Sequence, residues 1–252
     1  MAEEEKIREH AKQAIKALTN KKKKWTERLR DFLWEFLIIV VAINLTLWFH
    51  NWNDKKHDRE LEKDFLIGTR SDLNNIKNDL EFSLKAYQYT LDYYDSVWIQ
   101  INEHRIDKAF VDTNSFHLIN SRNFLYDNSR FENFKSSSYL RLIENDSLSR
   151  KITFLYSITL PTQELADKMI FDERRRDFIT YIGSKNRINS FDDLYYVSDL
   201  LNLPEVQFQI KWQRRMLKER KIHKQQTIQE IEEVIKEIDQ ELKMRFNYEI
   251  KL

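Results

Sequence analysis

The hydrophobic and polar residues of this chain follow three patterns. Residues 32–49 are eighteen positions that carry one charge, Glu35, and form a nearly continuous apolar run. On both sides of this run, apolar residues recur every three or four positions, which is the spacing of a helix with one buried face. Residues 105–200 are interrupted by Asn, Asp and Ser. The three patterns together predict an all-α protein.

Two long helices are expected outside the apolar run. From Leu80 to Ile101 the apolar steps alternate between four and three residues, and from Ile228 to Leu242 they do so again. Such heptad seams are typical of coiled coils. We expect the second helix to begin at Asn202 as the N-cap, with Glu205 completing a capping box. If the two helices are antiparallel, they form a coiled-coil hairpin.

The remaining segments complete the predicted organisation. Between the long helices we expect a small helical tip, with shorter helices at 139–160, 163–183 and 191–201. The predicted parts are a basic N-terminal segment (1–31), a transmembrane helix (32–52), a stalk helix (53–104), the tip (105–201) and a returning C-terminal helix (202–252).

The apolar run is long enough to cross the hydrocarbon core of a bilayer, which is about 30 Å thick. Tryptophans stand at both of its borders, as expected at the two lipid–water interfaces. The alternatives are the core helix of a soluble bundle and a cleaved signal peptide, but bulky residues follow the run where a cleavage site needs small ones. We interpret the run as an uncleaved signal anchor. The four border residues are Trp25, Trp34, Trp48 and Trp52.

The charges around the run predict its orientation. Residues 16–31 contain seven Lys and Arg, whereas residues 50–65 contain four. The positive-inside rule then places the N-terminus in the cytoplasm and the bulk of the chain in the periplasm of a bacterial inner membrane. The basic segment is expected to contact anionic lipid, mainly through Lys21, Lys22, Lys23 and Lys24.

Two polar side chains within the run are candidate functional residues. Glu35 lies near the cytoplasmic end, where a charge can reach the interface or pair with Arg28, or help to assemble subunits. Asn44 lies deeper, and an amide in hydrocarbon seeks a partner, which contributes about 0.6–2 kcal/mol between helices. Asn44 therefore suggests self-association of the span.

Composition excludes several classes of function. The chain has two glycines, Gly68 and Gly183, and no cysteine, so it contains no phosphate-binding glycine loop, nucleophile elbow or thiolate site. The formal net charge of +1 gives no global attraction to nucleic acid, which we do not expect as a partner. We expect no cofactor and no catalytic activity.

Two stretches resemble a group of uncharacterised single-span membrane proteins of Bacteroidota. The first runs from Glu35 through an apolar stretch to Asn51-Trp52-Asn53-Asp54, where the family usually closes with Asn-Trp-Asn-Glu. The second is the segment FKSSSYLRLIENDSLSRKI at 134–152, in which Ser138 replaces the usual glycine of a left-handed turn. The resemblance implies a single-span protein with a helical extracytoplasmic domain, and it implies no activity.

The remaining candidate chemistry is weak. His50, Asp54 and His57 have the helical spacing of a metal site, but such triplets are common in polar helices. The basic run 211–224 fits a solvated helix face, with phosphate binding as the alternative.

The leading hypothesis is a non-catalytic membrane-anchored scaffold, sensor or accessory subunit, whose partner is a second copy or another membrane protein. The rivals are an oligomeric effector or channel-like subunit that uses Glu35 and Asn44, and a metal-dependent enzyme.

Overall fold

The structure is a computed structural model that describes residues 2–119, 124–168, 174–185 and 197–248. All secondary structure in these residues is helical, which confirms the all-α fold. The chain divides into two units, residues 1–59 and residues 60–252. The described part of the first unit is entirely helical and belongs to α1 (Ala2–Asn102).

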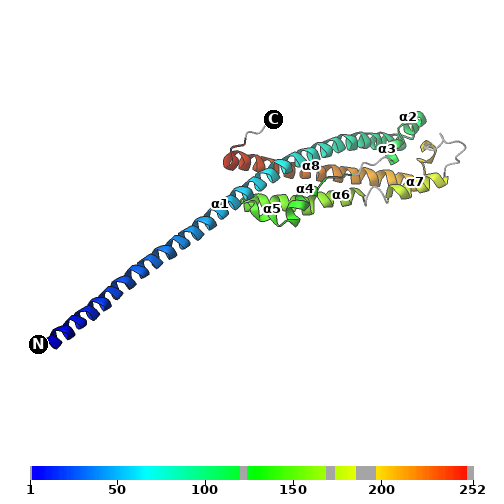
Figure 1. Cartoon of the computed structure of the whole chain (residues 1–252). Helices are drawn as coiled ribbons and strands as arrows, with labels where there is room; N and C mark the ends of the chain where they lie inside the picture. The colour runs from blue at the N-terminus through cyan, green and yellow to red at the C-terminus, as the bar shows by residue number, and fades with distance from the viewer. Residues whose placement is uncertain (1, 120–123, 169–173, 186–196, 249–252) are drawn as a thin grey trace. The chain divides into compact units, whose positions relative to one another are not determined.

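The second unit is a helical bundle built on the end of α1 and on α8 (Pro204–Phe246). Between them in sequence lie α2 (Lys108–Thr113), α3 (Phe116–Ile119), α4 (Ser129–Ser136), η1 (Tyr139–Leu142), α5 (Asp146–Phe154), η2 (Leu155–Thr159), α6 (Leu160–Asp167), α7 (Arg174–Lys185) and η5 (Ser198–Leu200). Figure 1 shows α5 and α6 running alongside α8.

The parts of α1 and α8 in the second unit are antiparallel, and polar pairs fix their register. An advance of seven residues along α1, from Arg70 to Lys77, is matched by a return of seven along α8, from Asp239 to Glu232. In this register the seam from Ile228 to Leu242 of α8 lies opposite about residues 67–81 of α1, and the seam from Leu80 to Ile101 of α1 lies opposite about residues 208–229 of α8. The pairs that join the two helices include Arg70–Asp239, Lys77–Glu232, Gln88–Lys221 and Asp95–Arg214.

The bundle differs from a hairpin with a tip, because residues 124–167 pack along the two long helices. Phe131, Leu148 and Leu160 are buried in the same core as Leu73 of α1 and Ile238 of α8. The physical reason is that α1 and α8 each present more apolar surface than one partner helix covers. The aromatic residues of the middle region are accordingly divided between two cores.

The segment α5–η2–α6 is one helical stretch that passes through Pro161. Proline lacks the N–H of the helical ladder, and its ring clashes with the carbonyl four residues earlier. Here the turn immediately before it, Leu155–Thr159, is widened into a π-helix. A π-turn separates that carbonyl from the ring, so the helix continues where the sequence predicted a gap between helices at 139–160 and 163–183.

One helix-end prediction needs correction. The N-cap of α8 is Leu203 rather than Asn202, and no side chain caps this end. Pro204 occupies the first turn, where its missing N–H costs nothing. Ser138 adopts the left-handed conformation with φ 60°, so the turn that glycine makes in the similar proteins is present here with serine.

Candidate functional site

The apolar part of α1 has no cover within the structure. Among the described residues, one helix is long and apolar enough to cross a membrane, and none of its most apolar window is buried. Trp25, Trp34, Trp48 and Trp52 are each more than half exposed. This exposure argues against the core helix of a soluble bundle, in which the same residues would be buried.

The polar side chains of this segment lie on different faces of α1. The Asn44 side-chain amide donates to the Val40 carbonyl at 2.7 Å, and the Thr46 hydroxyl donates to the Ala42 carbonyl at 2.8 Å. Part of the hydrogen-bonding capacity of Asn44 is thus satisfied within its own helix. Glu35 is nine residues from Asn44, which corresponds to about 180° around a helix, so the two face opposite sides.

His50, Asp54 and His57 do not gather into one group of three potential metal-ligating side chains. His50 Nε2 lies 3.5 Å from Asp54 Oδ2. His57 does not join them, and no group of three or more potential metal-ligating side chains occurs among the described residues. Lys21, Lys22, Lys23 and Lys24, the predicted lipid contacts, and Arg28 lie outside the residues whose side chains are described.

A charged layer is buried inside the second unit, between two apolar cores. One core contains Leu80 of α1 and Ile231 of α8, and the other contains Leu91 and Leu217. At the intervening level the buried residues of α8 are Arg220, Lys224 and Thr227, and Gln163 and Asp167 face them from α6.

Asp167 is the centre of this layer and accepts from two cations. Arg220 Nη2 donates to Asp167 Oδ1 at 2.6 Å, and Lys224 Nζ donates to Asp167 Oδ2 at 2.7 Å. The Tyr87 hydroxyl contacts the same carboxylate at 3.4 Å. Both Asp167 and Lys224 are fully buried, so the pair is sealed from solvent.

The layer holds more positive than negative charge, and this affects its titration. Burial lowers the pKa of Lys224, and the charge of Asp167 opposes the shift only in part. Burial also raises the pKa of Tyr87, and the Asp167 charge adds to that shift. Among the described residues, the Gln163 Oε1 and Ser83 Oγ atoms are buried without a hydrogen-bond partner. Such polar layers specify the register of packed helices more than they add stability.

The burial of Arg220 and Lys224 was predicted incorrectly from the sequence. The basic run 211–224 was expected to be a solvated face, yet Arg220 is only 7% exposed and Lys224 is not exposed at all. A signal was present, because Leu217, Lys224, Ile231 and Ile238 follow at intervals of seven residues. A lysine on a core heptad position indicates a buried, paired charge.

A second ion-pair cluster joins the part of α1 where the second unit begins and the end of α8 to the segment 134–152. Arg245 Nη1 and Nη2 donate to the two carboxylate oxygens of Glu62 at 2.6 and 2.8 Å. Glu62 also accepts from the backbone N–H of Glu144 at 3.0 Å. Asn145 caps α5 through the Ser147 and Leu148 N–H groups, and its side-chain amide donates to Glu241 at 2.6 Å.

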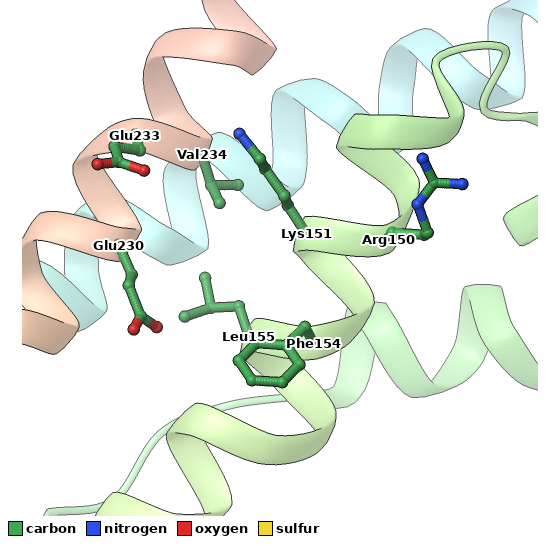
Figure 2. Close-up of a pocket in the computed structure, with 7 residues that line it drawn as sticks. All are labelled: Arg150, Lys151, Phe154, Leu155, Glu230, Glu233 and Val234. Carbon is green, nitrogen blue, oxygen red and sulfur yellow. The ribbon is translucent and has the colours of Figure 1, made fainter.

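A groove of about 280 Å³ lies between α5 and α8. Figure 2 shows Glu230 and Glu233 on the α8 side and Arg150 and Lys151 on the α5 side, with apolar side chains between them. The groove has an apolar floor and walls of opposite charge, and it is open to solvent. The apolar side chains are Phe154, Leu155 and Val234.

Comparisons with known proteins do not assign the chain to a family. No model of a protein family matches the chain, and no curated protein or solved structure is significantly similar to it. Its membership of the Bacteroidota group stays a prediction.

Proposed function

We propose that this chain is a single-pass protein of a bacterial inner membrane, and that it belongs to the Bacteroidota group that it resembles. Its helical domain, residues 60–252, serves as a non-catalytic scaffold, sensor or accessory subunit of a membrane complex. The N-terminal segment lies in the cytoplasm and the helical domain in the periplasm.

One observation carries the proposal. The apolar stretch Phe32–Phe49 is exposed throughout, whereas most apolar residues of the second unit are buried in or packed against two cores. Leaving that much apolar surface in water is unfavourable by about 25 cal/mol per Å², and a lipid environment removes the cost. The partly self-satisfied Asn44 amide is compatible with this environment.

A channel-like role for Glu35 and Asn44 is less well supported. On one helix the two side chains point in opposite directions, so they cannot both line one pore from the same copy of α1. The metal-dependent enzyme has no group of three ligating side chains among the described residues to support it.

The absence of cysteine makes the orientation directly testable. We suggest two single-cysteine variants, Thr19→Cys before the span and Ser71→Cys after it, because the wild-type chain gives no background labelling. A maleimide that cannot cross the inner membrane should label Ser71→Cys in intact cells and Thr19→Cys only after permeabilisation. The reverse pattern contradicts the orientation, and equal labelling of both positions contradicts the span.

A further inference from the structure

The helical stretch α5–η2–α6 carries an apolar stripe on its outer surface. Phe154, Ile158 and Leu165 are each more than half exposed, and Pro161 lies between them with partial exposure. Their steps of four, three and four residues are those of a packing seam. Opposite positions of the same stretch, such as Ile152 and Leu160, are fully buried in the core. The stretch thus has two apolar faces, and one of them is not covered by any described residue.

The charged groups beside the stripe are separated by sign. Where Phe154 borders the groove, the α5 wall carries Arg150 and Lys151, and the α8 wall carries Glu230 and Glu233 (Figure 2). Lys151 is ion-paired with Glu237, and Glu230 accepts from the Thr159 hydroxyl. Arg150 and Glu233 are exposed and form no hydrogen bond or ion pair with another described residue.

Because of this separation of charge, the grooves of two copies of the chain are electrostatically complementary in one relative orientation. A two-fold axis parallel to the groove places the α5 wall of one copy opposite the α8 wall of the other, so basic groups face acidic groups twice. A two-fold axis across the groove places like walls together, and like-charge contacts are repulsive. The isologous contact that the charges favour is therefore the one with parallel chains.

We propose that a second copy of this chain docks on the α5–α8 groove and its apolar stripe, with the two chains parallel. Phe154, Ile158 and Leu165 supply the apolar contact, and Arg150 of each copy faces Glu233 of the other.

A charge-reversal experiment tests this contact in the full-length chain. The dissociation constant of the dimer is measured by sedimentation equilibrium in density-matched detergent micelles. Arg150→Glu and Glu233→Arg each convert two attractive contacts into repulsive ones, so each should raise the dissociation constant about tenfold or more. An equimolar mixture of the two variants restores both contacts, and its dissociation constant should fall to within about threefold of the wild-type value.

Three further variants separate this surface from other routes to a dimer. Leu165→Asp should raise the dissociation constant, while Ile99→Asp, at a residue of similar exposure on α1, should leave it unchanged. Asn44→Leu, in the span, should also leave it unchanged.

The proposal is overturned by a monomeric wild type, which includes the case of a different protein occupying the groove. It is also overturned by a dimer that depends on Asn44, or by a mixture no tighter than the single variants. None of these outcomes bears on the membrane anchor, which membrane extraction tests separately.

Discussion

Glu62 and Arg245 are 183 residues apart in the chain and form a two-point ion pair, with nitrogen–oxygen distances of 2.6 and 2.8 Å. Glu62 is 2% exposed, and Arg245 also contacts Glu144 and Glu241. The pair joins the beginning and the end of the helical unit to the loop before α5.

Glu62→Ala should lower the free energy of unfolding by about 1.5–3 kcal/mol, because it leaves a half-buried guanidinium with weaker partners. Thermal unfolding of the full chain in detergent, followed by circular dichroism, measures the change. Glu132→Ala is the matched control, because its pair with Lys135 is exposed and should contribute at most about 0.5 kcal/mol. Equal losses in the two variants would show that the Glu62 pair has no special role.

Substitution of the anion of the charged layer should cost much more stability than substitution of one of its cations. Asp167→Asn removes the carboxylate that both Arg220 and Lys224 contact and leaves only the weaker influence of Asp79 on Lys224, so it should cost about 3–5 kcal/mol. Lys224→Met leaves the Asp167–Arg220 pair balanced and fills a similar volume, so it should change stability by about 1 kcal/mol or less. Urea unfolding of both variants provides the comparison. Similar losses would contradict the view that Asp167 neutralises two cations.

The lowered pKa of Lys224 predicts that the free energy of unfolding depends on pH. This pKa is lowered in the folded state, so between that value and the unfolded value of 10.5 the unfolded chain binds more protons. Stability therefore rises with pH across this interval. The difference in unfolding free energy between wild type and Lys224→Met should shift in favour of wild type as the pH rises from 7 toward 10. A difference that is constant with pH would show that Lys224 titrates normally.

Gly68 allows a close approach of the Arg130 side chain to α1. A Cβ atom at this position would lie 2.2 Å from Cζ of Arg130, whose Nε donates to Asp72 at 2.7 Å. Gly68→Ala gains about 1 kcal/mol of helix propensity but displaces that half-exposed ion pair, so its net effect should be close to zero. In the Arg130→Ala background the same substitution should stabilise by about 1 kcal/mol. Thermal unfolding of the four variants of this cycle tests the coupling, and additive effects would refute it.

The sequence predicted the long helices well because their signal is local. The alternating steps from Leu80 to Ile101 and from Ile228 to Leu242 correspond to faces that are largely buried. The position of residues 124–167 was not predictable in the same way, because it depends on the surface that α1 and α8 leave uncovered. Pro161 was read as a break because periodicity alone does not reveal a π-turn.

For a related reason, the sequence predicted the apolar run but not the Asp167 cluster. The apolar run with its tryptophan borders is a continuous stretch, so composition alone identifies it. The Asp167 cluster combines residues from three helices, and only Lys224, at a core heptad position, carried a local sign of it. Phe154, Ile158 and Leu165 have the spacing of a seam, but the sequence does not tell whether such a seam faces the core or the solvent.

Membrane extraction tests the anchoring of this chain most directly. Membranes that contain the full-length protein are treated with alkaline carbonate and floated on a density gradient. The wild type should float with the lipid, whereas Ile39→Lys/Ile43→Lys should be released, because each charge at the centre of a span costs about 2.5–3.5 kcal/mol. Release of the wild-type protein by carbonate would contradict the anchor.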